Sequence, residues 1–287
     1  MGECKKTDAK LGEKCSQTIE NKVERNLRGV KHKIIVMSGK GGVGKSTVAV
    51  NLAVGLSMRG CSVGLLDADM HGPSVPKLLG LPPMPLEILD EKRIIPAIVP
   101  PSLKVVSIAF LLREKYSPII WRGPLKMGAI RDFLENVEWG TLDYLIVDLP
   151  PGTGDEPLSV VQLIPGPDGA IIVTTPQDVA LLSVRKSINF AKEMGLRVLG
   201  MIENMNGLSC PHCGERIDVF GDGGAAKAAA EMDVEFLGSL PLDPSIAKSG
   251  DDGAPFILAR GNGATKAFET MINRISELVK KKKGDTT

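Results

Sequence analysis

Residues 39–46 read Gly-Lys-Gly-Gly-Val-Gly-Lys-Ser, and this octapeptide decides the fold and the chemistry of the chain. The apolar run Ile34–Met37 precedes it and the run Thr47–Leu52 follows it, so a buried strand turns into a helix here. A phosphate-binding loop requires this strand, loop and helix context. A tight glycine turn that binds nothing has a similar composition, but a full match in this context favours a nucleoside triphosphate as the ligand.

Each position of the loop has a chemical task in this interpretation. Backbone N–H groups of a glycine-rich loop point inward around a phosphate. Lys45 is expected to reach the β and γ phosphates, and the Ser46 hydroxyl is expected to ligate Mg²⁺. The nucleotide-binding residues predicted in the loop are Gly39, Lys40, Gly41, Gly42, Val43, Gly44, Lys45, Ser46 and Thr47.

Size and charge limit the classes of function. The 287 residues, 43% of them hydrophobic, are enough for one large α/β domain. The net charge is +1, from 35 basic and 34 acidic residues, so no global field attracts nucleic acid or a membrane surface. No segment has the length and apolarity of a membrane span or a signal peptide. We expect a cytoplasmic protein that binds no nucleic acid and has no stable membrane association.

The order of apolar runs predicts the fold class. Residues 1–30 contain little apolar material and are expected to form a mobile extension, with a helical turn near residues 19–27. Residues 31–287 are expected to form a doubly wound α/β domain, in which helices cover both faces of a mostly parallel sheet. Strands are predicted near 33–38, 62–67, 104–109, 143–149, 169–175, 196–203 and 234–240, and helices near 45–59, 124–137, 156–164, 178–194, 223–232 and 263–282. The proline-rich stretch 72–101 is expected to be a long surface excursion.

Acidic residues follow two predicted strands, at the edge of the sheet where ligands bind in such folds. Asp67 and Asp69 come at the end of one strand. Asp69 is positioned to orient or deprotonate the attacking water, and Asp67 to hold the loop or a water on Mg²⁺, with capping as the alternative for both. Asp148 ends another strand, which is the pattern of the Walker B aspartate that binds Mg²⁺ through water in P-loop ATPases. His71 has no partner in the sequence and is expected to be an exposed loop residue.

Residues 149–156, Leu-Pro-Pro-Gly-Thr-Gly-Asp-Glu, follow Asp148 directly. The stiff proline pair and the flexible glycines suit a switch whose backbone, at Gly152, contacts the γ phosphate and moves once it leaves. A plain proline–glycine turn has the same composition. The adjacent Asp148 favours the switch.

Cys210-Pro211-His212-Cys213 has the C-x-x-C spacing that brings two thiolates onto one metal or cluster. The pair lies in a loop at 206–216 after a late strand, whereas a thioredoxin-type pair opens a helix after the first strand of a different fold. Zinc and a [4Fe–4S] cluster each need about four protein ligands, so two copies across a twofold axis would complete the site. Inert or redox-active thiols are the alternative. Cys61 is most simply a buried core residue.

The motifs together resemble a known family. Residues 38–47 resemble the deviant phosphate-binding loop of the MinD, ParA, nitrogenase iron protein and Mrp group of ATPases. With residues 67–74, 148–155 and 210–213, they closely resemble the Mrp (ApbC) family of iron–sulfur cluster carrier ATPases. The resemblance covers residues 31–280. It implies a homodimer that holds a labile [4Fe–4S] cluster between paired C-x-x-C loops, hydrolyses ATP slowly and hands the cluster to apo iron–sulfur proteins.

The same resemblance implies roles for single residues. Lys40 is expected to cross to the nucleotide of a partner subunit. Asn204 is expected to recognise adenine, with Pro241 and Asp243 on the other side of the base, although Asp243 can equally cap a helix. The eukaryotic scaffold relatives carry four cysteines in an N-terminal extension. This chain has only Cys4 and Cys15 there, so a second cluster held by one chain is not expected.

Two other functions use the same nucleotide machinery. A MinD- or ParA-like positioning ATPase acts on a membrane or DNA, and an apolar helix face at residues 268–279 before Lys280–Lys283 would suit an acidic bilayer. Such a terminal helix more often packs on its own domain. An electron-donating reductase like the nitrogenase iron protein retains its cluster, and its cluster cysteines are not paired as C-x-x-C. The cysteine pair therefore favours the carrier.

Overall fold

The computed structural model of the protein describes residues 22–82, 85–89, 92–111, 123–259, 261 and 263–281. Residues 22–26 are helical, and Val23 and Leu27 are buried. Asn26 Nδ2 donates hydrogen bonds to the carbonyl oxygens of Leu134 and Val137, at 2.8 and 2.9 Å. Residues 22–30 therefore belong to the packed domain, although their composition predicts a mobile extension. The rest of that predicted extension, residues 1–21, lies outside the described residues.

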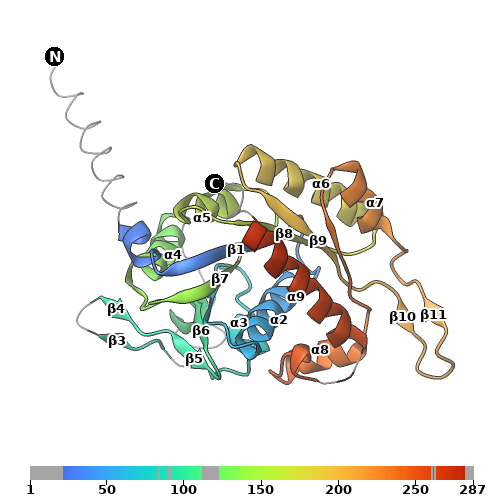
Figure 1. Ribbon diagram of the computed structural model, residues 1–287, viewed down its shortest axis with the longest axis horizontal. Helices are drawn as coiled ribbons and strands as arrows, with labels where there is room; N and C mark the ends of the chain where they lie inside the picture. The colour runs from blue at the N-terminus through green and yellow to red at the C-terminus, as the bar shows by residue number, and fades with distance from the viewer. Residues whose placement is uncertain are drawn as a thin grey trace, which may run out of the picture.

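An eight-stranded sheet forms the centre of the domain, in the order β12-β9-β8-β1-β7-β2-β6-β5 (Figure 1). Its members are β1 (Val30–Ser38), β2 (Val63–Asp67), β5 (Ala97–Val99), β6 (Leu103–Ser107), β7 (Leu142–Asp148), β8 (Gly169–Thr174), β9 (Val198–Glu203) and β12 (Phe236–Ser239). All neighbours are parallel except β5 and β6, which pair antiparallel at one edge. The predicted doubly wound, mostly parallel sheet is confirmed, and each predicted strand overlaps an observed one.

Helices cover both faces of the sheet. Because successive strand residues point to opposite sides, Ile34 and Val36 of β1 face one core layer and Ile35 and Met37 the other. The first layer is shared with α2 (Lys45–Met58), α3 (Val75–Leu78) and α9 (Gly263–Lys281), and the second with α4 (Gly123–Asn136), α5 (Asp155–Leu163), α6 (Asp178–Glu193) and α7 (Gly224–Glu231). Because both faces of the sheet are buried, the sequences of its central strands are nearly continuous apolar runs.

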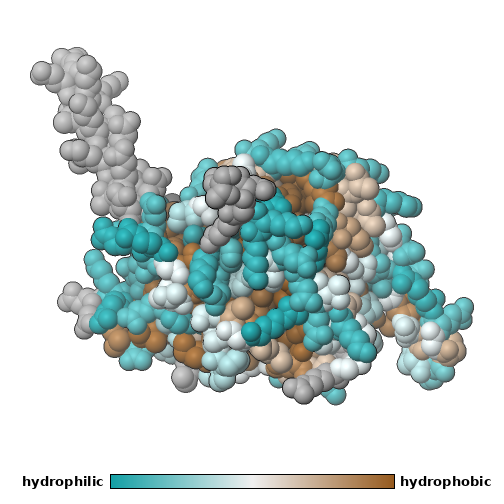
Figure 2. Space-filling model, viewed as in Figure 1, coloured by the Kyte–Doolittle hydropathy of each residue, from teal (hydrophilic) through white to brown (hydrophobic). Residues whose placement is uncertain are grey.

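The last helix, α9, buries its apolar face on the domain. Phe268, Ile272, Ile275 and Val279 are each 0% exposed, and Figure 2 shows mainly hydrophilic side chains over the outer side of this helix. The expectation that this helix packs on its own domain is confirmed. Within the described ranges, no helix is long and apolar enough to span a membrane.

The stretch 72–101 is not an irregular excursion, which corrects the sequence-based expectation. It contains α3, a hairpin of β3 (Ile88–Leu89) and β4 (Arg93–Ile94), and the edge strand β5. Pro76 lies in the first turn of α3, where its missing N–H has no helical partner to lose. The sequence pattern also does not predict α8 (Pro244–Asp251) or the hairpin of β10 (Leu208–Ser209) and β11 (Arg216–Ile217). These elements are too short to show a periodic pattern.

Candidate functional site: nucleotide loop and cysteine ribbon

The predicted phosphate-binding loop connects β1 to α2. Gly42 and Gly44 have φ of 77° and 83°, and Gly44 directly precedes the first helical residue. A Cβ atom on Gly44 would lie 2.1 Å from Asn204 Nδ2, so only glycine lets the loop approach that side chain. The first turn of α2 has no acidic residue and no side-chain cap. Its backbone N–H groups are therefore available to an anion.

The Lys45 ammonium lies between two acids at the carboxyl ends of the strands. Its Nζ is 2.7 Å from Asp148 Oδ1 and 3.5 Å from Asp69 Oδ2, and it donates to Ser46 Oγ at 3.3 Å. The lysine is only 6% exposed, and a buried charge of this kind needs such partners. The structure thus brings together four residues that the sequence predicted to share one site.

Asp67 and Asp148 are register partners on the adjacent strands β2 and β7, and both are 0% exposed. Burial, and then the neighbouring Asp148 charge, raise the pKa of Asp67 to about 7. Burial also raises the pKa of Asp148, whose buried Oδ2 has no hydrogen-bond partner among the described residues. An orphaned carboxylate oxygen beside a second acid fits Mg²⁺, which Ser46 and Asp148 would hold, Asp148 through water. When bound, the ion offsets the charge of both acids.

The two acids at and just after the end of β2, Asp67 and Asp69, have different surroundings. Asp67 accepts hydrogen bonds from Ser107 Oγ at 2.8 Å and from the backbone N–H of Val75 at 3.3 Å. It also accepts one from the backbone N–H of Asp69 at 3.2 Å. Asp67 therefore holds the loop, which is one of the two roles predicted for it. Asp69 is 9% exposed, so its carboxylate is the one of the two that solvent reaches.

His71 belongs to a cluster that sequence reasoning missed. Its side chain is 64% exposed, as an exposed loop residue should be, but Nε2 lies 2.9 Å from the Glu156 carboxylate and 3.2 Å from Lys126 Nζ. Lys126 Nζ also donates to Glu156 at 3.1 Å. The cluster connects the loop after β2 with the start of α5 and with α4. Nothing in the sequence pairs these residues, because only the placement of β2 beside β7 brings them together.

Two residues with predicted contacts to a nucleotide, Lys40 and Gly152, contact other parts of the fold. Lys40 Nζ donates to Oε1 of Gln177, the N-cap residue of α6, at 3.0 Å. Gly152 N–H donates to the carbonyl oxygen of Ser38 at 2.8 Å, which attaches the predicted switch to the strand that enters the loop. Gln177 carries no motif and is not predictable from the sequence. Contact of Lys40 with a second nucleotide stays a prediction.

A cavity of about 360 Å³ lies beside the loop. Asn204, the predicted adenine-binding residue, donates from Nδ2 to the Val43 carbonyl oxygen at 3.0 Å. The predicted neighbours Pro241 and Asp243 line the same cavity. Asp243 Oδ1 also accepts from the Ser245 N–H at 2.8 Å and caps α8, which confirms the capping alternative. Recognition of a base by these residues stays a prediction.

Cys210 and Cys213 lie at the tip of the β10–β11 hairpin, residues 207–219, which we call the cysteine ribbon. Cys210 N–H donates to the Glu215 carbonyl oxygen at 2.8 Å, and Gly214 N–H to that of Cys210 at 2.9 Å. The ribbon projects from one side of the molecule in Figure 1 and forms a separate lobe in Figure 2. Backbone N–H groups, of Cys213 first and then of His212, hydrogen-bond to the Cys210 sulfur and lower its pKa. A lower pKa favours the thiolate form that binds metals.

The ribbon alone does not supply a complete metal site. Cys213 is exposed and Cys210 is partly exposed. Within the described part of the chain, no group of three or more His, Cys, Asp or Glu side chains is placed to hold a metal ion. Cys61 is half-buried at the edge of the core, not fully buried as the sequence predicts, because it lies just before β2 begins. Cys4 and Cys15 lie outside the described residues.

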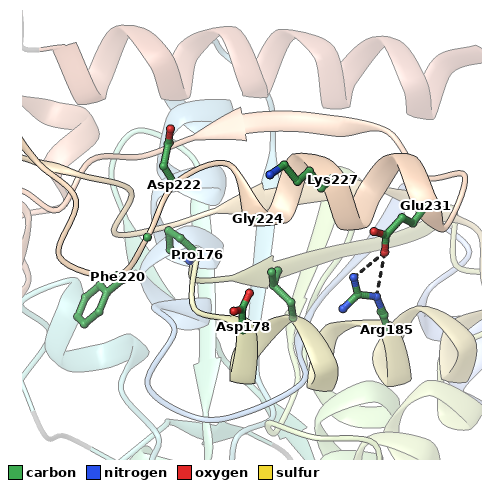
Figure 3. Close-up of a pocket in the computed structure, with 10 residues that line it drawn as sticks. Pro176, Asp178, Arg185, Phe220, Asp222, Gly224, Lys227 and Glu231 are labelled. Carbon is green, nitrogen blue, oxygen red and sulfur yellow. Dashed lines mark hydrogen bonds and ion pairs between the residues drawn. The ribbon is translucent and has the colours of Figure 1, made fainter.

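A second hollow, of about 320 Å³, lies between α6 and α7 (Figure 3). Arg185 of α6 pairs with Glu231 of α7 at 2.5 Å on one side of it. Asp222 and Gly224, which follow the cysteine ribbon, line it as well. The chain leaving the ribbon therefore runs beside α6, the helix whose N-cap contacts Lys40.

Comparison with known proteins agrees with this geometry. The ParA family model described as NUBPL iron-transfer P-loop NTPase matches residues 29–276. The iron-sulfur cluster carrier protein of Methanocaldococcus jannaschii is 49% identical over 265 residues, which cover 91% of this chain and 90% of the relative. A cytosolic Fe-S cluster assembly factor of Kluyveromyces lactis is 48% identical over 227 residues, covering 77% of this chain and 80% of the relative.

Solved structures have the same architecture. A nucleotide-binding protein from Archaeoglobus fulgidus in complex with ADP has a TM-score of 0.71 at 43% identity, covering 82% of this chain and 91% of that chain. The cell division ATPase MinD of Pyrococcus furiosus shares the fold, with a TM-score of 0.65 at 23% identity and coverage of 86% and 99%. By its sequence, its sheet and its loop, the chain belongs to the ParA family of NUBPL iron-transfer P-loop NTPases.

Proposed function

We propose that the protein is an ATP-dependent iron–sulfur cluster carrier of the cytoplasm, which binds a labile [4Fe–4S] cluster and transfers it to apoproteins. The observation that carries this proposal is the cysteine ribbon, which presents Cys210 and Cys213 at the tip of a projecting hairpin. The ribbon begins three residues after Asn204, which contacts the nucleotide loop. Relatives nearly half identical to the chain are named as carriers and assembly factors for such clusters.

The number of thiols supports a homodimer. A [4Fe–4S] cluster takes about four cysteine ligands, and one ribbon has two. A second copy of the ribbon across a twofold axis supplies the other pair, since an isologous interface places the same surface of both subunits in contact. The cluster is then held by the Cys210 and Cys213 thiols of two chains at the surface of each subunit. A cluster that is released to another protein requires such an accessible site.

ATP hydrolysis would use the residues around the loop. Lys45 binds the β and γ phosphates, Ser46 and Asp148 hold Mg²⁺, and Asp69 orients or deprotonates the attacking water. Lys40 of each subunit reaches the nucleotide of the other. Gly152 senses the γ phosphate through its backbone.

A positioning ATPase that acts on a membrane or DNA is the second candidate, and the structure favours it less. The apolar face of α9 that would lie on a bilayer is buried in the domain, with Phe268 and Ile272 each 0% exposed. A positioning ATPase would also have no use for the paired cysteines of the ribbon.

Anaerobic reconstitution with iron and sulfide tests the proposal. The wild-type protein is expected to bind about four irons per dimer, and Cys210→Ala and Cys213→Ala are expected to bind none while binding ATP normally. Cys61→Ala is the matched control, because this thiol lies apart from the ribbon, and it should bind iron as the wild type does. Equal iron in the ribbon variants, or a protein that stays monomeric with both ATP and the reconstituted cluster, would refute the carrier.

A further inference from the structure

One short segment joins the nucleotide loop to the cysteine ribbon. Asn204 donates to the loop at Val43, and Met205, whose φ is 60°, lines the cavity beside it. Asn206 and Gly207 follow at once and lead into β10. Positive φ is uncommon for a residue that carries a Cβ, so Met205 is held in this conformation by its surroundings. A ligand that fills the cavity therefore touches the segment that carries the ribbon.

Arg216 fastens the ribbon to this segment. Its Nη2 donates to Asn206 Oδ1 at 2.6 Å and to Asp222 Oδ1 at 2.8 Å. Its Nε donates to Asp218 Oδ1 at 2.7 Å. The planar guanidinium can make these contacts at once, which a lysine ammonium cannot do in the same geometry. Arg216 thus connects the strand that enters the ribbon with the chain that leaves it.

Gly207 makes this contact possible. Its φ is +67°, and a Cβ atom there would lie 2.8 Å from Arg216 Cζ. The guanidinium therefore lies directly against the first residue of the ribbon. Any residue larger than glycine would displace it.

The other side of the Asn206 amide is fixed to the sheet. Asn206 Nδ2 donates to the Glu203 carboxylate and to Ser239 Oγ, the latter at 3.1 Å. Glu203 is 0% exposed at the end of β9, and its Oε1 accepts from the Ala225 N–H at the start of α7. Asn206 is thus bonded to Glu203 on the sheet through Nδ2 and to Arg216 on the ribbon through Oδ1, so it links the two through one side chain directly after Met205.

We propose that Asn206 and Arg216 form a clamp that transmits nucleotide occupancy from the cavity beside the loop to the Cys210–Cys213 pair. Arg216 acts as a positioning residue: its hydrogen bonds go to Asn206, Asp218 and Asp222, and it sets the orientation of the ribbon through Asn206. The role of the clamp in cluster release rests on the proposed carrier function. The coupling itself is tested on the metal-free protein, apart from iron binding.

Thiol alkylation of the metal-free protein measures this coupling. Rates of iodoacetamide modification at Cys210 and Cys213 are read by peptide mass spectrometry with and without MgATP, with Cys61 as the internal reference. In the wild type, MgATP is expected to change the rate at the ribbon thiols by about fivefold or more, the lower end of typical coupling between sites. Arg216→Ala and Asn206→Ala should react at one rate under both conditions while ATP affinity stays as in the wild type.

Further variants separate a broken clamp from a disordered ribbon. Arg216→Lys keeps the charge beside Asp218 and Asp222 but lacks the fork that reaches Asn206, so it should also lose the response to MgATP. The double variant of Asn206 and Arg216 should be no worse than either single one, as expected for residues that act through one contact. Arg185→Ala is the matched control, because Arg185 pairs with Glu231 on α7 and not with the ribbon; it should respond as the wild type does.

A wild-type protein whose ribbon thiols ignore MgATP would overturn the clamp, and so would a full response in Arg216→Lys or Asn206→Ala. Neither result bears on iron binding. Absence of iron from the reconstituted wild type would instead refute the carrier function and leave the alkylation result standing.

Discussion

The nucleotide loop and the cysteine ribbon are neighbours along residues 204–207, yet they differ in how they hold charged groups. Lys45, Asp67 and Asp148 are at most 6% exposed and are fixed by one another and by the strand ends. On the ribbon, the side chain of Arg216 is 51% exposed and Cys213 is exposed. A buried site fixes its geometry before a ligand arrives, whereas an exposed pair of thiols is open to a second protein.

The two regions also differ in electrostatic cost. Burial raises the pKa values of Asp67 and Asp148, and a neighbouring carboxylate adds to each rise, that of Asp148 at Asp67 and that of Asp69 at Asp148. A cation therefore stabilises the site that holds them. The ribbon has the opposite arrangement, in which N–H groups directed at the Cys210 sulfur lower its pKa. Substitutions around the loop should therefore have large effects, and substitutions at the ribbon tip should leave folding unchanged.

The largest effect is expected from Lys45→Ala. Removal of the cation takes away the group that reaches the phosphates and leaves Asp69 and Asp148 without their ion-pair partner. The dissociation constant of ATP should therefore rise by about 100-fold or more. Titration calorimetry with MgATP measures this loss. Iron binding at the ribbon should be unaffected, and a variant that keeps wild-type ATP affinity would show that the buried ion pair has no part in nucleotide binding.

Asp69→Ala should separate turnover from binding. This carboxylate is expected to act on the attacking water, and loss of a general base typically costs about 100-fold or more in rate. Single-turnover hydrolysis of ATP should slow by that factor while the dissociation constant of ATP changes little. Asp143→Ala, which removes the ion pair with Lys31 near the start of β7, is the control for general loss of structure. Normal turnover by Asp69→Ala would refute the assigned role.

Asp67→Asn should change the pH dependence of stability. The folded-state pKa of Asp67 is raised from 3.8 to about 7, so between these values the folded protein holds a proton that the unfolded chain releases. The stability from this group is therefore fully present below about pH 4 and lost as the pH rises to about 7. Relative to Asp67→Asn, the wild-type free energy of unfolding should fall by about 2–4 kcal/mol from pH 4.5 to 7.5.

Urea denaturation of the nucleotide-free and metal-free proteins at several pH values tests this difference. The asparagine also loses one acceptor for the loop N–H groups, but that loss is the same at every pH. The readout is how the difference in unfolding free energy between the two proteins changes with pH, and not the size of that difference at any one pH. If the plots of unfolding free energy against pH are parallel for the two proteins, Asp67 is charged in the folded state at pH 5.

Contiguous motifs made the nucleotide loop and the cysteine pair predictable from the sequence, since residues 39–46 and 210–213 carry their chemistry in neighbouring positions. The strand-end acids Asp69 and Asp148 followed from the alternation of apolar runs and helices. What the sequence does not contain is the lateral order of the strands, and that order creates the contact of Lys40 with Gln177 and the cluster around His71.

Short elements were unpredictable for a related reason. The hairpin β10–β11 has two residues in each strand, too few for a pattern. Its attachment depends on Arg216 and Asn206, which are ten residues apart and carry no motif. Similarly, the buried position of Val75 in α3 depends on packing against the core, and the prolines around it indicated only a loop.

The smallest effect is expected from Cys213→Ala on folding. The thiol is exposed at the ribbon tip, and surface substitutions away from caps and cores usually change stability by no more than about 0.5 kcal/mol. Thermal and urea denaturation of the metal-free variant should therefore match the wild type, whereas Ile272→Ala, a truncation in the core face of α9, should cost about 2–5 kcal/mol in the same assay. A destabilised Cys213→Ala would mean that the ribbon supports the domain even without metal. A stable one that no longer binds iron would mean that the thiol contributes to cargo binding alone, because the domain folds around the nucleotide loop without it.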